Sequence, residues 1–491
     1  MNTPPAGYES TTPSISRRAT EIAKIPTLFW VVIALSMVFA GTSTNPLESC
    51  AVVAALATGV LLIWGVDPSR AMLFVFTYQW AQASVKVFQA NVQGVPLDQF
   101  AEIGGQVDTA TWLSLVAVVV VAAGMRLAAR VGPAKRADVT VLPDYVIGAN
   151  PMFWFRVYMV FLLTSLIASA FAGLVSELFQ PLQALAGLKW GFFWLFAYFT
   201  FSRPDRRVDL FAIVFAIEFV LGLGGFFSDF KSVFFVTFMA MLAAQVRVTL
   251  PRLLIIVPPL IALVFVSLVW TAIKTEYRDF VGGGSNMQLV TVGYEERMTY
   301  LGELISNVTS QDMIDAVDVA ATRFSYVEIF GSVLDSVPAL VPHEGGAIWL
   351  DAVIRPFTPR LLFPDKSVIE DSARTNTFTG LDVFGQERGT SISIGYVGES
   401  YIDFGFFGMF LPLFMWGMLL GLVSRYFINH SRIKGALGGA MVVAVLLPQA
   451  ALETSITKAF GGLIVSVLVA FLVAKYAVPK TLMQLARLHA R

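Results

Sequence analysis

Charged residues are scarce in this sequence, and so are the side chains that usually bind metals. Charged residues make up 14% of the 491 positions, whereas about a quarter is usual for a soluble protein. The single cysteine, Cys50, excludes an intrachain disulfide and a metal site made of several thiolates. The three histidines, His343, His430 and His489, show no metal-ligand spacing. We therefore expect no metal and no cofactor. The formal net charge is zero, so bulk charge indicates no partner, and we expect no nucleic acid.

Apolar residues are abundant, and they occur in long runs. Hydrophobic residues account for 56% of the chain, and runs of about 18 or more recur along it, as is typical of transmembrane helices. The pattern predicts an all-α polytopic membrane protein with about twelve transmembrane helices. The third of these contains Gln79, Gln82 and Lys86, and the sixth is short. The predicted spans are residues 27–43, 48–66, 69–89, 110–127, 153–175, 187–202, 208–225, 230–246, 253–273, 395–424, 436–452 and 460–478.

Basic residues gather on one side of the predicted membrane. Arg17, Arg18 and Lys24 precede the first span, and most basic residues of the other short connections follow even-numbered spans. Cytoplasmic loops of membrane proteins carry an excess of lysine and arginine. We therefore expect cytoplasmic tails at both ends, over residues 1–26 and 479–491.

One predicted connection is much longer than the others. Residues 274–394 separate a first membrane block, residues 27–273, from a second block, residues 395–478, and fall on the outer face. Loops of this length in compact proteins are usually functional. Apolar residues recur at helical spacing within the loop, so we expect short helices that lie on the membrane surface and cap a cavity.

The segment "RPFTPRLLFPDKS" in this loop combines cations with backbone rigidity. It contains Arg355, Arg360 and Lys366, together with three prolines that fix a non-helical backbone. Arginine offers a planar fork to oxyanions and lysine a point charge, so the segment suits an anionic lipid head such as a pyrophosphate. Alternatively, these cations extend to lipid headgroups or pair with nearby aspartates.

A single acid, Glu399, lies where the tenth predicted span begins, between Tyr396 and Tyr401. Ionisable groups at membrane depth are costly and are often functional. The carboxylate could act as a general base for a sugar hydroxyl, or could hold that hydroxyl by hydrogen bonding. Alternatively, it forms a structural pair with an arginine of the loop.

Two further cations also have a functional and a structural interpretation. Lys231 follows "GGFFSD" at the outer end of the eighth span, where it could reach the same anion or lie at the membrane interface. Arg323, in "ATRFSYVE", lies on a predicted surface helix, where it could bind the anion or pair with Glu328 or Asp318.

The order of these motifs resembles that of the oligosaccharide repeat-unit polymerases, of the O-antigen polymerase type, which assemble bacterial surface polysaccharides. Those proteins have an Arg-x-Ser on a loop helix, then a Pro-Arg-apolar-Pro-x-Lys segment, then a Gly-Glu-x-Tyr-x-x-Phe-Gly opening of the next span. This sequence has "RFS" at 323–325, "PRLLFPDK" at 359–366 and "GESYIDFG" at 398–405. "KTEYRDF" ahead of the loop is also similar and includes Arg278, whereas Lys231 stands where members often have arginine.

The resemblance implies a metal-independent glycosyltransferase of the membrane-embedded C type. Such an enzyme transfers a growing glycan from undecaprenyl pyrophosphate to a new lipid-linked repeat unit on the outer face of the bacterial inner membrane. It implies Glu399, Arg360 and Arg323 as catalytic residues, and Tyr401 and Tyr396 as residues that position the acceptor. Donor pyrophosphate binding would fall to Lys366, Arg355, Arg278 and Lys231. The implied partners are the lipid-linked oligosaccharide, membrane lipids, and a chain-length regulator and flippase of the same pathway.

Two other functions fit a protein of this kind. An O-antigen ligase, which moves finished glycan to another acceptor, shares the number of spans and the large outer loop. Ligases are expected to use an outer histidine together with arginines, and His343 is the candidate for that role here. A lipid-linked glycan flippase or another transporter would have charged residues spread through its spans and a symmetry between its two halves. The sequence shows neither, since only Glu218 and Lys86 lie well inside predicted spans.

Overall fold

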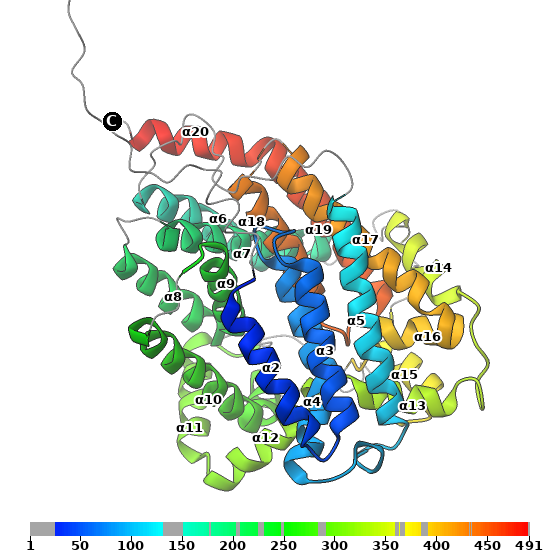
Figure 1. The fold of residues 1–491 in the computed structure, drawn as a ribbon. Helices are drawn as coiled ribbons and strands as arrows, with labels where there is room; N and C mark the ends of the chain where they lie inside the picture. Colours follow the sequence, from blue (N-terminus) through cyan, green and yellow to red (C-terminus); the bar gives the residue numbers. More distant parts are fainter. Residues whose placement is uncertain are drawn as a thin grey trace, which may run out of the picture.

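A computed structural model shows a helical protein (Figure 1). Within the residues that it describes, every regular element is a helix and no strand is present. These residues are 25–130, 151–175, 178–202, 207–223, 230–246, 250–282, 291–358, 363, 369–383, 391–431, 433 and 435–489.

The first half of the chain forms nine α-helices within the described residues. They are α2 (Thr27–Gly41), α3 (Pro46–Ile63), α4 (Ala71–Gln93), α5 (Val107–Arg130), α6 (Pro151–Ala172), α7 (Phe179–Ser202), α8 (Val208–Leu223), α9 (Phe230–Ala243) and α10 (Leu250–Val281). A short 3-10 turn, η1 (Leu97–Gln99), precedes α5.

The second half begins with shorter helices and returns to longer ones. The shorter helices are α11 (Tyr294–Asn307), α12 (Ser310–Phe324), α13 (Val327–Ser336), α14 (Ala347–Ile354) and α15 (Asp371–Thr379), with the 3-10 turn η4 (Arg355–Phe357) after α14. The later elements are α16 (Gly395–Gly408), α17 (Phe410–Arg425), η6 (Tyr426–His430), α18 (Gly435–Leu446), η7 (Leu447–Gln449), α19 (Ile456–Leu472), η8 (Val473–Ala477) and α20 (Val478–His489).

Six stretches of helix in the described part of the chain are long and apolar enough to cross a membrane. They are Pro46–Ile63, Val107–Arg130, Pro151–Ala172, Phe179–Ser202, Phe410–Asn429 and Ile456–Leu488. Three shorter helical stretches, Thr27–Gly41, Phe230–Ala243 and Gly435–Gln449, are also apolar. The prediction of an α-helical membrane protein is therefore confirmed, with six candidate spans by length and composition.

The predicted third and tenth spans differ from the helices observed. Residues 69–89 correspond to α4, which is not among the six candidate spans because its polar residues lower its hydropathy. Residues 395–424 form two helices, α16 and α17, rather than one. The break lies at Gly405, whose φ of 69° and ψ of −170° interrupt the helical backbone. Because φ is positive there, glycine is the residue that adopts this conformation without strain.

Helix α7 lies at the centre of the apolar core. Residues 190–200 are all buried, and apolar side chains occur on every face of the helix over this stretch. A helix with apolar residues on every face is buried by its neighbours, here α6, α9, α18 and α19. The predicted short sixth span, residues 187–202, is thus the end of a helix that begins at Phe179.

Glycines allow the helix backbones to approach closely. A Cβ atom on Gly417 of α17 would overlap the Val121 carbonyl of α5, and one on Gly421 would overlap the Met125 carbonyl. These glycines are four residues apart and lie on the same helix face, as in helix pairs that pack through small residues in membranes. This packing places α17 along α5 (Figure 1). Because α16 immediately precedes α17 in the chain, the same packing fixes the end of α16.

We predict that Gly417→Ala destabilises the purified protein by about 1–3 kcal/mol, because the added methyl group forces two backbones apart. Gly461→Ala in α19 is the matched control, since a Cβ there meets nothing within 4 Å. Thermal unfolding in detergent should show a lower midpoint for the first variant and an unchanged or slightly higher one for the second. Equal midpoints in the two variants would contradict this account of the α5–α17 contact.

Candidate functional site

The structure divides the predicted site residues into two groups. Lys231, Arg278 and Arg323 come together around α10, whereas Glu399, Tyr396, Tyr401 and Arg355 lie around α14, α16 and α19. Arg360 and Lys366 lie outside the described residues.

Four cations from three helices form the first group. Lys231 is the second residue of α9, Lys274 and Arg278 lie one turn apart on α10, and Arg323 is near the end of α12. We call these four residues the cation cluster. Helix α10 packs against both α9 and α12, which brings the charges within electrostatic reach of one another. Lys231 and Arg323 are exposed, while Lys274 and Arg278 are partly buried.

The crowding of positive charge is seen in the pKa of Lys274. Burial is the largest cause that lowers this pKa, followed by the positive charges of Arg278, Arg323 and Lys231, and together they lower it to about 8. Burial and the charge of Arg323 also lower the pKa of Arg278. Because like charges repel, an arrangement of this kind is stabilised by a bound anion. Two guanidinium forks and two ammonium groups suit an anion with several oxygens, such as a pyrophosphate.

A network of ion pairs and hydrogen bonds anchors the end of α12 that carries Arg323. Thr322, the residue before it, donates a hydrogen bond of 3.0 Å to Glu102, which forms a 2.7 Å ion pair with Lys86 of α4. Lys86 also pairs with Glu328 of α13, and the Glu102 amide donates to Glu328 over 3.2 Å. The charge of Lys86 inside the protein thus has a structural explanation, because it ties α4 to the junction of α12 and α13.

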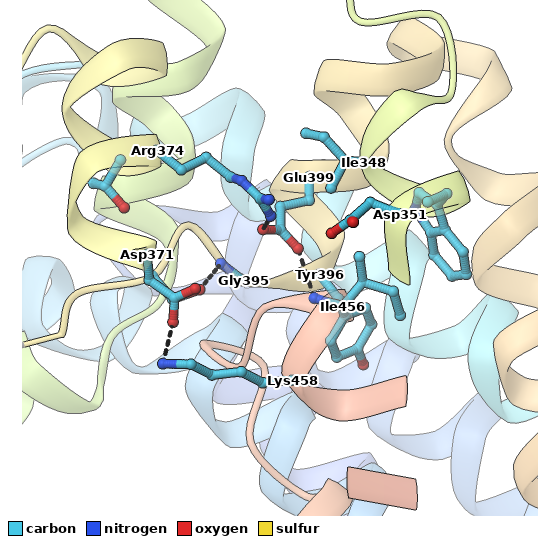
Figure 2. Close-up of polar contacts among 12 residues, drawn as sticks. Ile348, Asp351, Asp371, Arg374, Gly395, Tyr396, Glu399, Ile456 and Lys458 are labelled. Carbon is cyan, nitrogen blue, oxygen red and sulfur yellow. Dashed lines mark hydrogen bonds and ion pairs between the residues drawn. The ribbon is translucent and has the colours of Figure 1, made fainter. Parts of the chain in front are cut away.

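Glu399 is buried, and both of its carboxylate oxygens accept hydrogen bonds (Figure 2). Oε1 accepts from Arg374 Nη1 of α15 at 2.7 Å, and Oε2 accepts from the Ile456 amide at the start of α19 at 2.6 Å. The first four amides of a helix lack partners within that helix, so a carboxylate is stabilising at this point. The observed contact therefore matches the structural alternative for Glu399, a pair with an arginine from the predicted loop.

A second ion pair supports the same junction. Asp371 of α15 pairs with Lys458 of α19 at 2.6 Å, so α15 is tied to α19 both here and through Glu399 (Figure 2). Burial lowers the pKa of Arg374, but the negative charges of Glu399, Asp371 and Asp351 outweigh it and leave that pKa raised. Arg374 is therefore charged and held among carboxylates.

The remaining predicted residues around α16 also make protein contacts. Tyr401 donates its hydroxyl to the Val337 carbonyl at 3.0 Å, and the ring of His343 packs against the Tyr401 ring. His343 Nδ1 lies 3.1 Å from the Ile402 carbonyl oxygen. Arg355 pairs with Asp351 at 3.2 Å. The hydroxyl of Tyr396 is buried and has no hydrogen-bond partner in the described residues.

Glu218, the other acid predicted inside a span, is also paired. Its carboxylate accepts from Lys189 of α7 at 2.7 Å and from the Tyr158 hydroxyl of α6. Three helices therefore share one buried charge, which neutralises it within the apolar core.

Sequence reasoning missed two charged residues that the structure places beside predicted ones. Lys274 joins the cation cluster, and its spacing of four from Arg278 on one helix was the available signal. Glu453, between α18 and α19, accepts a hydrogen bond from Gln82 of α4. The sequence signal for Glu453 was weaker. It consisted of an acid between two apolar runs, together with three polar residues on the predicted third span that could contact it.

The helical fold, the candidate spans and the buried ion pairs define an α-helical membrane protein. The chain belongs to the family described as a domain of unknown function, DUF8712, which matches residues 114–446 and hence more than half of the sequence. The matched stretch includes the whole cation cluster and Glu399. No curated protein and no solved structure matches the chain.

We predict that Arg323→Gln slows the labelling of Lys274 by an amine-reactive reagent at pH 7.5 several-fold. Removing a positive neighbour favours the protonated amine, so the pKa of Lys274 rises from about 8 and less of the reactive neutral form is present. Peptide mass spectrometry of the labelled protein measures the rate. Labelling of Lys480, an exposed residue of α20, should not change. An unchanged rate at Lys274 would show that the two charges do not interact.

We predict that Arg374→Gln destabilises the protein by about 1.5–3 kcal/mol, because it leaves the buried Glu399 carboxylate with one fewer charged hydrogen-bond donor. Glu399→Gln in the same background should recover part of this loss, since a neutral amide is less costly to bury. Thermal unfolding of the two single variants and the double variant gives the coupling energy. Additive effects would mean that the ion pair contributes nothing to stability.

Proposed function

We propose that this protein is a membrane glycosyltransferase that polymerises oligosaccharide repeat units carried on undecaprenyl pyrophosphate. The observation that supports it best is the cation cluster, because residues from three separate helices meet there and two of them are partly buried. Three of its four members, Lys274, Arg278 and Arg323, fall on segments similar to those of the repeat-unit polymerases, and Lys231 stands where members often have arginine.

The chemistry of the reaction explains why cations are needed. When the growing glycan leaves its carrier, the pyrophosphate takes up negative charge as the glycosidic bond breaks. Fixed cations that face this charge stabilise the transition state, and each such group typically contributes 100-fold or more, as an order of magnitude. In this proposal the cation cluster binds the donor pyrophosphate, and Arg360 and Lys366 of the similar Pro-Arg segment add to it.

The proposed topology has about twelve spans, with both termini in the cytoplasm and residues 274–394 outside the bacterial inner membrane. The arrangement of the described helices supports it, since α11, α12 and α13 lie at one end of the protein and α20 lies at the other (Figure 1). The donor and the acceptor would then both be lipid-linked glycans of the outer leaflet. A chain-length regulator and a flippase would act in the same pathway.

Glu399 takes a modified role in this proposal. Because its two oxygens already bind Arg374 and the Ile456 amide, it holds α15, α16 and α19 together next to Tyr396. Arg355 belongs to the same side of the protein through Asp351. These residues shape the acceptor side, and the cation cluster forms the donor side.

A strain that lacks the gene tests the proposal when surface glycan and lipid-linked intermediates are both resolved by size. We predict single repeat units without a ladder of longer chains. Full-length polymer stranded on the carrier would instead indicate a ligase, and repeat units trapped on the inner face would indicate a flippase. An unchanged glycan profile would overturn the proposal.

The same strain tests the cation cluster when it is complemented with variants. Lys274→Ala combined with Arg323→Ala should reduce chain extension by about 100-fold or more, because two fixed cations are lost from the leaving group. Arg207→Ala is the control, since Arg207 is exposed and pairs with its near neighbour Asp209. Both variants must be present in the membrane fraction in comparable amounts, so that a loss of chain extension does not reflect a loss of protein.

A further inference from the structure

The connection between α18 and α19, residues 447–455, packs against helices that carry the proposed site. Gln82 of α4 accepts a hydrogen bond from the Leu452 amide at 2.8 Å and donates one to the Glu453 carboxylate. Gln79, one turn earlier, donates to the Gln449 carbonyl at 3.1 Å. The Tyr396 amide donates to the Thr454 carbonyl at 3.0 Å, which joins the connection to the start of α16.

Several buried polar groups beside this connection lack partners. Within the described part of the chain, no hydrogen bond reaches Gln79 Oε1, Tyr396 OH, Gln449 Oε1 or Ser455 Oγ. Each of these side chains is at most 5% exposed. Buried polar atoms are nearly always hydrogen-bonded, so four such atoms around one short connection call for a ligand or water that offers several donors and acceptors.

Glu453 differs from the other carboxylates near the site. The oxygens of Glu399 both accept hydrogen bonds within the protein, whereas Glu453 is exposed and accepts a hydrogen bond from the side-chain amide of Gln82. The buried side chain of Tyr326 lies within electrostatic reach of both acids. Burial raises the pKa of Tyr326, and the charges of Glu399 and Glu453 both raise it further, although the hydroxyl accepts a hydrogen bond from the Gly398 amide.

Helix α4 joins this carboxylate to the cation cluster. The Tyr78 ring packs on Phe324, the residue after Arg323, with ring centroids 5.4 Å apart. Gln82 lies four residues after Tyr78, on the same face of α4, and binds Glu453. The Tyr326 amide also approaches the Gln82 carbonyl at 3.4 Å. One turn of α4 therefore contacts the residue after Arg323 at one end and Glu453 at the other.

We propose that Gln79, Gln82, Tyr396, Gln449, Glu453 and Ser455 form an acceptor subsite for a hydroxyl-rich sugar, in which Glu453 is the general base. The inference rests on the proposed function and assigns its acceptor side. Amide, hydroxyl and carboxylate groups complement sugar hydroxyls, which both donate and accept hydrogen bonds.

The proposed step balances as a displacement at the anomeric carbon of the donor glycan. The acceptor hydroxyl oxygen forms a bond to that carbon, and the bond from the carbon to the pyrophosphate oxygen breaks. The pyrophosphate leaves with the electron pair and is stabilised by the cation cluster. The hydroxyl proton passes to the Glu453 carboxylate. No oxidant, reductant or additional reactant is needed.

The test uses full-length protein in lipid nanodiscs, with lipid-linked single repeat units extracted from the deletion strain as the probe. Glu453→Gln should lower kcat by about 100-fold or more with KM within threefold, because general-base catalysis typically contributes about 10²–10⁴-fold. Glu453→Asp should retain intermediate activity, since it keeps a carboxylate. Gln449→Leu should mainly raise KM, because it removes a hydrogen-bonding group from the subsite.

Two controls separate catalysis from folding. Glu303→Gln removes an exposed carboxylate of α11 and should leave kcat unchanged. Glu453→Gln can still accept the hydrogen bond from Gln82, so its thermal midpoint should match the unaltered protein.

The possible failures can be told apart. If the deletion abolishes the ladder but Glu453→Gln keeps kcat within threefold, the general-base assignment is overturned and the polymerase proposal stands. The same holds if Glu453→Asp is as inactive as Glu453→Gln while both remain folded. If the unaltered protein extends no probe and the deletion leaves the glycan unchanged, both proposals fail.

Discussion

The buried ammonium group of Lys86 is the interaction on which the arrangement of the site depends. An ammonium group without partners in an apolar core would cost several kcal/mol, so the carboxylates of Glu102 and Glu328 must remain beside it. Glu102 precedes α5 and Glu328 belongs to α13, so one charge ties three parts of the chain together. These contacts are also directional, because the Glu102 amide donates a hydrogen bond to the Glu328 carboxylate and the Glu102 carboxylate accepts one from the Thr322 hydroxyl.

Helix α4 owes its place inside the protein to the same constraint. Its polar residues lower its hydropathy, yet Gln79, Gln82 and Lys86 are all buried. Each makes contact with a segment that lies far away in sequence: Gln79 with residue 449, Gln82 with residues 452 and 453, and Lys86 with residues 102 and 328. Apolar packing alone is non-directional, so these hydrogen bonds determine which segments meet α4 and in what register.

The helical fold could be predicted because apolar runs and backbone hydrogen bonding in a membrane leave few alternatives. The break at Gly405 was harder to predict, since glycines are common in membrane helices and only the φ angle distinguishes this one. The candidate site was predicted in part. Lys231, Arg278 and Arg323 were identified on separate motifs, but Lys274 was not. The proximity of these four cations depends on how α9, α10 and α12 pack, and no local sequence pattern predicts that packing. Glu453 was not predicted as a site residue, because its partner, Gln82, lies 371 positions away in the sequence.

The charged groups of this protein fall into two physical classes, and the difference points to their roles. Glu399, Asp371 and Glu218 each face a cation of the protein, so their burial is compensated and they hold helices together. The cation cluster brings positive charges beside one another, and the residues near Glu453 include buried polar atoms with no partner in the described chain. Neighbouring charges of the same sign repel, and buried polar atoms without partners are costly, so both arrangements lower stability. Such a cost is offset when a ligand supplies negative charge and hydrogen bonds, as a pyrophosphate would for the cations and a sugar for the unpartnered groups.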